Sequence, residues 1–424
     1  SVLIPVAAAR HACAGLTATL LLLVGLQAWS ASAPADAIRL RYELKLSSDT
    51  ASAEARIVVE QSKGHLRELQ LSAGSLTGKP GGDGQVRRTG SKLIWNPPAN
   101  GGELRYQVRL THRRSARDAS SHDAWVGSKL AIFRGEKAFP ITAWRLTKGS
   151  ALHGVLALAA PRGWSVITPY LPDPAGRMLI TNPGHRKARP LGWIIAGDIG
   201  TRRDVIAGSE ITVSAPRGIR MERLAMLGLL RWTLPELVPA LGKGPAYLNI
   251  VAAAEPMWLG ALSAPNSIFI HANRPLISEN GTSTIVHEMV HVLLADLETP
   301  DDQDWIDEGL AEYFALRALL DSGTISETRY VQTIASLREW GSKVSSLRTT
   351  SSTGPVSARA TTVFHDLDAE LRQATGKKKD LAGLVRGLLS GGETAELQSL
   401  RRKTQQLMGH PPVALAPAAV PGFD

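Results

Sequence analysis

Hydrophobic and polar residues alternate in short runs over residues 38–217. In IRLRYELKL (Ile38–Leu46) every second residue is apolar, and similar runs are ELRYQVRLTH (103–112) and GSEITVSAP (208–216). A period of two residues is typical of a β-strand with one buried face. The stretches between the runs are rich in Gly, Pro and Asn, which is typical of turns. The pattern therefore predicts an all-β domain, a sandwich, over residues 38–217.

The pattern changes to helical spacing in the next part of the chain. In residues 219–242 apolar positions recur three and four apart, and we expect a helix that is interrupted near Pro235 and Pro239. Two apolar runs follow, AYLNIVAAAE (246–255) and NSIFIHAN (266–273), and they predict strands of a small sheet.

Helical spacing resumes at Ser283 and continues to about Leu407. The fold class predicted from these patterns is α+β, with a second domain over residues 218–408. The last segment, 409–424, is rich in Pro and Ala, and we expect it to be a flexible tail.

Residues 1–37 have the composition of a signal peptide. A short head with Arg10 precedes the apolar run Ala14–Trp29, and the small residues SASAPADA (30–37) follow it. We therefore expect an exported protein, periplasmic or secreted, with an uncleaved membrane anchor as the alternative. The only cysteine, Cys13, lies in this segment, which excludes an intramolecular disulfide and a zinc site built from cysteines.

The chain carries a formal net charge of +10, from 48 Lys and Arg against 38 Asp and Glu. Its densest basic runs, at 112–117, 377–379 and 401–403, are scattered and are not interleaved with aromatic residues. Proteins that bind single-stranded nucleic acid need such aromatic platforms, so we predict no nucleic-acid partner. The excess charge allows a weak association with anionic surfaces.

The stretch STIVHEMVHVLLADLETPDDQDWIDEGLAEYF (Ser283–Phe314) contains the candidate chemistry. His287 and His291 are four residues apart on a predicted apolar helix, so their imidazoles share one face and can occupy adjacent corners of a zinc tetrahedron. Glu288 points about 100° around that helix, where a carboxylate can take a proton from metal-bound water. The alternative is a set of satisfied core groups, but burying three ionisable residues without a cation is unfavourable.

A third ligand is expected from the next helix. Sixteen residues separate Glu308 from His291, and the acidic residues just before Glu308 are typical of the start of a helix. Glu312 lies four residues further on, on the same face, and can hydrogen-bond a ligand imidazole. A solvent-facing charge is the alternative interpretation of Glu312.

These motifs resemble those of the gluzincin metallopeptidases. H-E-x-x-H followed by W-x-[ND]-E-G-[FL]-A-x-Y is similar to the aminopeptidase-N-like and glycyl-aminopeptidase-like families. The matching residues of the second motif are Trp305, Asp307, Glu308, Gly309, Leu310, Ala311 and Tyr313. The resemblance implies a thermolysin-like zinc metallopeptidase domain over residues 218–408. It also implies one Zn²⁺ on His287, His291 and Glu308, Glu288 as general base, and a peptide or protein substrate.

One departure from the family pattern concerns the substrate's free amine. The stretch GALSAPNSIFI (260–270) aligns with the family's G-x-M-E-N strand, in which the glutamate holds that amine. Ser263 and Ala264 stand at the Glu and Asn positions, so we predict that this chain is not a strict aminopeptidase. Glu255 or Glu279 could replace the missing acid from another direction. The backbone that we expect to bind an extended peptide by strand addition belongs to Gly260, Ala261, Leu262 and Ser263.

A second departure concerns the family tyrosine that stabilises the oxyanion, where this chain has Ser357. We predict His365 as the replacement donor, with Tyr330 and Arg359 as the other candidates. The alternative function is a zinc-bearing envelope protein that binds peptides without hydrolysing them.

Overall fold

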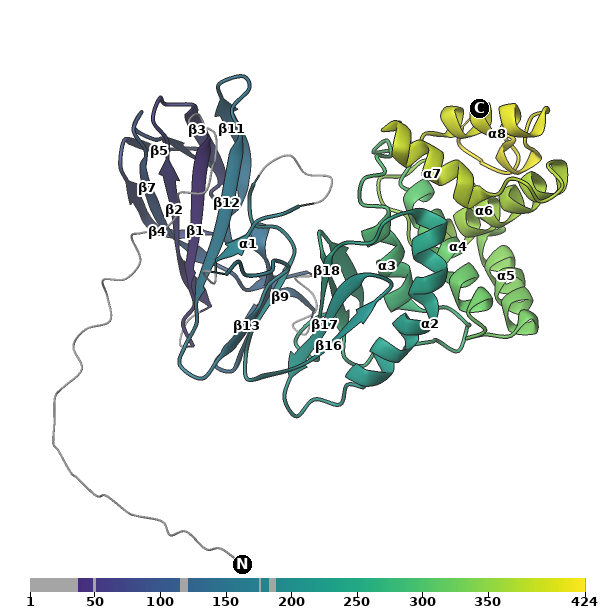
Figure 1. The fold of residues 1–424 in the computed structure, drawn as a ribbon, viewed down its shortest axis with the longest axis horizontal. Helices are drawn as coiled ribbons and strands as arrows, with labels where there is room; N and C mark the ends of the chain where they lie inside the picture. Colours follow the sequence, from purple (N-terminus) through teal and green to yellow (C-terminus); the bar gives the residue numbers. More distant parts are fainter. Residues whose placement is uncertain (1–36, 49–50, 115–120, 175–176, 183–187, 424) are drawn as a thin grey trace, which may run out of the picture.

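The computed structural model describes residues 37–48, 51–114, 121–174, 177–182 and 188–423. The predicted signal peptide, apart from Ala37, lies outside these residues, as does Cys13. The described chain is a mixed α+β structure, in which a sheet-rich N-terminal part lies beside a helical C-terminal part (Figure 1). The predicted fold class is confirmed at this level.

Two sheets of the N-terminal part share one hydrophobic core. The six-stranded sheet has the order β14 (Met178–Leu179), β12 (Leu152–Ala159), β1 (Ile38–Lys45), β2 (Ser52–Glu60), β7 (Gly102–Arg109), β4 (Leu76–Gly82). The four-stranded sheet has the order β11 (Ile141–Leu146), β3 (Leu66–Ser72), β6 (Lys92–Asn96), β5 (Gln85–Thr89). Alternate residues of β1 and β2 are buried, and Tyr42 and Trp95 lie fully inside the shared core. The alternation of apolar and polar residues in the sequence therefore corresponds to one buried face on each of these strands.

A third sheet connects the two parts of the molecule. Its order is β13 (Ser165–Ile167), β15 (Trp193–Gly197), β10 (Leu130–Arg134), β9 (His122–Val126), β8 (His112–Arg113), and the short helix α1 (Gly135–Ala138) follows β10. Along β15, Ile194 and Ala196 face the N-terminal core. Trp193 and Ile195 face the other way and pack against Phe269 of the next sheet. All five residues of β15 are buried because each of its faces meets a sheet.

The fourth sheet belongs to the C-terminal part. Its order is β16 (Ile199–Ile206), β17 (Ser209–Pro216), β18 (Tyr247–Ala253), β20 (Ser267–His271), β19 (Ala261–Ala264). The two strands predicted from apolar runs are β18 and β20. The predicted domain boundary after residue 217 is wrong, because β17 pairs in parallel with β18 and β16 pairs with β17. Both β16 and β17 therefore belong to the sheet of the C-terminal part. Strand periodicity identifies β17 as a strand but carries no information about its partner.

Among the described residues, seven helices longer than one turn belong to the C-terminal part. They are α2 (Arg223–Leu241), α3 (Thr284–Leu293), α4 (Trp305–Asp321), α5 (Glu327–Gly341), α6 (Pro355–Ala374), α7 (Leu381–Gly391) and α8 (Leu397–Met408). Figure 1 shows α2 and α3 near this sheet and α5 to α8 farther from it. The predicted interruption of α2 is wrong, because the helix continues through Pro235 and Pro239. Each proline removes one backbone hydrogen bond, but the leucines between and around them remain packed in the core.

Helix α2 also has the length and composition of a membrane span, and it is the one such helix in the described part of the chain. Its apolar character has a simpler explanation in this fold. Leu230, Leu234 and Leu237 of α2 lie in the core that the C-terminal helices share.

The C-terminal tail is packed and not flexible, so that prediction is wrong. A short helix, η1 (Val413–Leu415), lies in it, and Leu415 and Val420 are fully buried. Phe423 lies beside Trp305 of α4, with ring centroids 6.4 Å apart. The apolar residues among the prolines and alanines anchor this segment to the helical core.

Candidate metal centre

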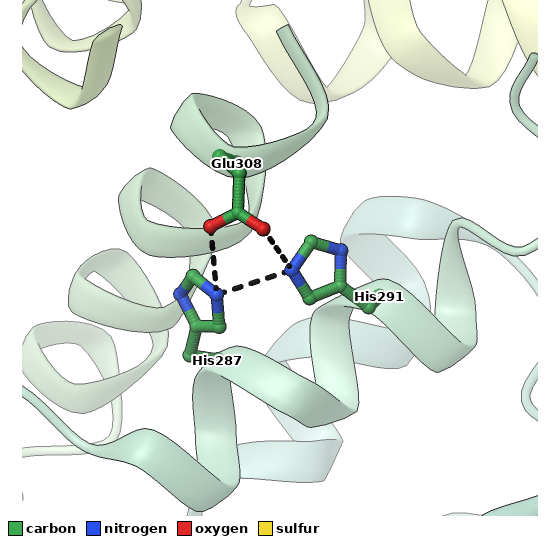
Figure 2. A group of neighbouring side chains, drawn as sticks. All are labelled: His287, His291 and Glu308. Carbon is green, nitrogen blue, oxygen red and sulfur yellow. Dashed lines mark hydrogen bonds and ion pairs between the residues drawn. The ribbon is translucent and has the colours of Figure 1, made fainter. Parts of the chain in front are cut away.

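Helix α3 positions the two histidines. Ser283 caps its first turn, where the side-chain oxygen accepts a hydrogen bond from the backbone N–H of Val286. Ile285 and Met289 fix the opposite face in the core. The imidazoles of His287 and His291 then project toward α4 (Figure 2).

Helix α4 brings Glu308 to the same place. Its carboxylate points down between the two imidazoles in Figure 2. The next residue, Gly309, allows α6 to approach closely, because a Cβ there would lie 2.8 Å from the Cβ of Ala360 and 2.9 Å from the ring of Phe364. The structure therefore brings together the three residues predicted as metal ligands.

The spacing of the three ligands suits a small tetrahedral cation. The Nε2 atoms of His287 and His291 are 3.1 Å apart, and each lies 3.4 Å from one oxygen of Glu308. Donor atoms bound to tetrahedral zinc at about 2.0–2.2 Å lie about 3.3–3.6 Å from one another. The two histidines and the carboxylate fit three of its corners and leave the fourth open.

Both histidines have carboxylate partners on their other ring nitrogen. Nδ1 of His287 lies 2.8 Å from Glu312, as the sequence predicted, and Nδ1 of His291 lies 3.2 Å from Asp307. A carboxylate at Nδ1 holds the proton there and directs the Nε2 lone pair toward the centre. The sequence analysis missed this role of Asp307, although the residue precedes Glu308 within the recognised motif.

The electrostatics of this cluster favour positive charge. Burial lowers the pKa of His287, but the carboxylates of Glu308 and Glu312 outweigh it and raise that pKa to about 9. Burial likewise opposes protonation of His291, and Asp307 and Glu308 raise its pKa well above the usual value. For Glu308, burial raises the pKa, yet the two imidazoles bring it far below its ordinary range. The carboxylates around the two histidines therefore stabilise a cation at this site, although burial removes it from water.

Glu288 lies beside the metal ligands and contacts the edge of the sheet. The residue is buried, with 8% of its surface exposed, and its Oε2 accepts a hydrogen bond of 2.6 Å from the backbone N–H of Ser263. This contact fixes one carboxylate oxygen of Glu288 at β19.

Strand β19 is the edge of its sheet, which agrees with the predicted peptide-binding edge. The carbonyl of Gly260 accepts from the N–H of His271, and the carbonyl of Leu262 accepts from the indole Nε1–H of Trp193. Because an antiparallel strand directs alternate residues to each side, Ala261 and Ser263 direct their backbone groups to the open edge, where the N–H of Ser263 already donates to Glu288. Of the four predicted residues, Ala261 and the carbonyl of Ser263 are oriented toward an added strand.

The three candidate oxyanion donors have other partners. Nδ1 of His365 lies 2.9 Å from Asp366, and its ring lies beside that of Tyr330. The guanidinium of Arg359 donates to the backbone carbonyls of Ala418 and Ala419. Within the described residues, no hydrogen bond or ion pair connects His365, Tyr330 or Arg359 to the three metal-ligand candidates. The predicted role of His365 gains no support from these contacts.

The two acids considered as substitutes for the family's amine-binding glutamate make contacts with other residues. The carboxylate of Glu255 is exposed and lies 3.9 Å from Nε2 of His271. The backbone carbonyl of Glu279 accepts a hydrogen bond from Arg329. No ion pair places either carboxylate beside the triad in the described part of the chain.

Comparisons with known proteins support the fold. No protein-family model and no curated protein matches this chain. Among solved structures, an aminopeptidase N family protein from Idiomarina loihiensis has a TM-score of 0.61 at 15% identity, covering 83% of this chain and 70% of its own.

Two further structures are similar over more of this chain. An M1 zinc metallopeptidase variant from Deinococcus radiodurans, bound to the substrate Tyr-Ser-Ala, has a TM-score of 0.60 at 16% identity, covering 92% and 94% of the two chains. Native yeast LTA4 hydrolase has a TM-score of 0.56 at 14% identity, covering 91% of this chain and 66% of its own. This chain therefore has the fold of the M1 zinc metallopeptidases.

Proposed function

We propose that this chain is a zinc-dependent metallopeptidase with a thermolysin-like catalytic domain. The observation that carries the proposal is the group His287, His291 and Glu308, whose ligand atoms have the spacing of three tetrahedral corners. The shared fold with the M1 zinc metallopeptidases supports it. On the strength of residues 1–37 we place the activity in the periplasm or outside the cell.

The residues present fit one Zn²⁺, with His287, His291 and Glu308 as its ligands. Such an ion supplies a Lewis acid and lowers the pKa of a bound water toward neutrality. We assign Glu288 as the general base, which would take a proton from such a water and deliver it to the leaving nitrogen. Asp307 and Glu312 hold the two imidazoles in the required tautomer.

We infer that the substrate is a peptide bound as an extra strand on β19. The backbone groups of Ala261 and the carbonyl of Ser263 would pair with its main chain. Because Ser263 and Ala264 carry no charge, a free ammonium group there would lack the charge-assisted hydrogen bond that an acid supplies, worth about 1.5–3 kcal/mol. We therefore propose cleavage within peptides or near blocked ends.

A pair of peptides that differ only in N-terminal acetylation tests this substrate class. We expect the acetylated peptide to be cleaved at least as fast as the free one, because the side chains of Ser263 and Ala264 offer no acid to a free amine. Mass spectrometry of the products measures both rate and position. If single residues are released from the free peptide and the acetylated peptide resists cleavage, the protein is an aminopeptidase and the proposed substrate class is wrong.

The Asp307→Ala variant tests whether Asp307 holds the imidazole of His291 in place. We expect the zinc affinity to fall about 10- to 100-fold, because the imidazole loses the partner that fixes its tautomer and orientation. Competition with a chromogenic zinc chelator measures the affinity. The exposed Asp301→Ala, in the turn before α4, is the matched control and should bind zinc like the wild type. Equal affinities in the two variants would remove Asp307 from the site.

The second candidate function is a zinc-bearing protein that binds peptides without hydrolysing them. The observation that favours it is that Nδ1 of His365, the ring of Tyr330 and the guanidinium of Arg359 contact other groups, and none of these contacts involves the metal triad. Under this alternative the zinc and the peptide affinity are both present while no product forms.

A further inference from the structure

Helix α2 is apolar on the side that faces solvent as well as on the side that faces the core. Its outer side carries a continuous stripe of apolar residues, which we call the α2 stripe: Leu224, Ala225, Gly228, Trp232, Pro235 and Pro239. At about 100° per residue, these positions cover an arc of about 100°, with Arg231 at one border and Glu236 at the other. An apolar arc of this width normally faces the core of a protein.

The two large side chains of the α2 stripe lie mostly outside the protein. Leu224 is 67% exposed and Trp232 is 65% exposed. The opposite side of the helix, with Leu230, Leu234 and Leu237, is packed in the core, so α2 cannot rotate to bury the stripe without exposing these leucines. Water therefore contacts an apolar surface that is stabilised when a partner covers it.

Basic residues surround the α2 stripe. Asp204 of β16 pairs with Arg231, at 2.5 Å between the two charged groups, which places β16 along that border (Figure 1). Arg202 lies on the same face of β16 as Asp204, because side chains alternate along a strand. Arg220 lies just before α2 and Lys243 just after it. Arg202, Arg220 and Lys243 are exposed, and none of them has an ion-pair partner among the residues that the structure describes.

The acidic residues of this region do not balance its positive charge. Glu222 and Glu236 are exposed near the stripe, whereas Asp198 and Asp204 are each paired with an arginine. Residues 198–243 contain seven Lys and Arg against five Asp and Glu, so the region has the same sign of charge as the whole chain. A partner with negative charge is therefore favoured.

An anionic bilayer surface fits this combination of groups. Trp and Leu side chains enter the boundary between headgroups and acyl chains, while neighbouring Lys and Arg contact anionic headgroups. A second copy of this chain fits less well, because a two-fold contact brings the same positive charge together from both sides. Crossing the bilayer would require α2 to leave the core in which its leucines are packed.

We propose that the α2 stripe docks on an anionic membrane surface. Helix α2 lies in the plane of the interface, and Leu224 and Trp232 insert among the headgroups. Arg202, Arg220 and Lys243 contact the anionic headgroups around them. None of the six stripe residues is a metal-ligand candidate, so the docking does not depend on the peptidase function.

Fluorescence quenching by brominated lipid measures whether Trp232 contacts the bilayer. The full chain is mixed with vesicles of brominated phosphatidylcholine and phosphatidylglycerol at a ratio of about 3:1. Bromine quenches only nearby tryptophans, so wild type should be quenched, and the quenched component should shrink in Trp232→Phe. Trp340→Phe is the matched control, because Trp340 is 56% exposed on α5, and its quenching should equal that of wild type. Equal quenching of wild type and Trp232→Phe would overturn the proposal.

The same signal from Trp232 tests the two kinds of contact, because it reports on α2 whatever else holds the chain to the vesicle. Arg202→Gln combined with Arg220→Gln should raise the lipid concentration at half-maximal quenching about tenfold or more. Lys378→Gln combined with Lys379→Gln removes the same charge from exposed positions after α6 and should leave it unchanged. Leu224→Ser should raise it several-fold, whereas the exposed Val331→Ser on α5 should not. If the α2 variants match their controls, the α2 stripe is not the docking surface.

Sedimentation velocity without lipid distinguishes the bilayer from a second copy of the chain. We expect a monomer, because the positive charge around the α2 stripe opposes its pairing with itself. A dimer that dissociates in Leu224→Ser would show that a second copy covers the stripe, and the membrane proposal would then be wrong.

Discussion

A Glu288→Gln variant is expected to keep its zinc and to lose about 100- to 10,000-fold of its peptide hydrolysis. The carboxylate acts on the water and is not one of the three ligand candidates, so the metal should stay. Glutamine also retains an oxygen that can accept the hydrogen bond from the N–H of Ser263, so the fold and the edge strand should be unaffected.

Turnover and elemental analysis of the same preparation measure both parts of this result. Glu339→Gln, at an exposed position on α5, is the matched control and should behave like the wild type. Unchanged turnover in Glu288→Gln, or loss of its zinc, would contradict the assignment of the general base.

Glu308→Ala is expected to abolish stable zinc binding. The variant keeps two imidazoles but loses the carboxylate that lies 3.4 Å from each of them. Since a metal that binds only the folded state adds stability, wild type should unfold at a higher temperature than the variant when zinc is present. The difference should shrink in excess chelator.

Elemental analysis and thermal unfolding, each with and without chelator, provide the measurement. Glu312→Ala is the graded control, because Glu312 touches His287 only at Nδ1 and its loss should weaken zinc affinity about 10- to 100-fold. Full zinc occupancy in Glu308→Ala would exclude it as a ligand.

The local parts of the site could be predicted from the sequence. His287, Glu288 and His291 lie on one helix, so helical geometry alone fixes their relative directions. Glu308 and Glu312 were found because they stand in a second short motif with its own helix. Within each of the two motifs the site residues lie within about one helical turn of each other, and a single short connection joins the two helices.

The parts that sequence reasoning missed depend on contacts between distant segments. The pairing of Asp307 with His291 requires the rotation of α4 relative to α3, and no periodicity encodes that angle. The pairing of β17 with β18 crosses α2 and moves the domain boundary. Composition suggested a flexible tail, but burial of Leu415 and Val420 determines its structure.

The measurement that tests the central claim most directly is hydrolysis of an N-acetylated peptide mixture before zinc removal, after chelation, and after stoichiometric zinc is restored. If His287, His291 and Glu308 hold the catalytic ion, cleavage should disappear with the chelator and return with one zinc per chain. Cleavage that persists in a zinc-free chain would contradict the metal mechanism. A folded chain that holds zinc and releases no product would contradict the peptidase.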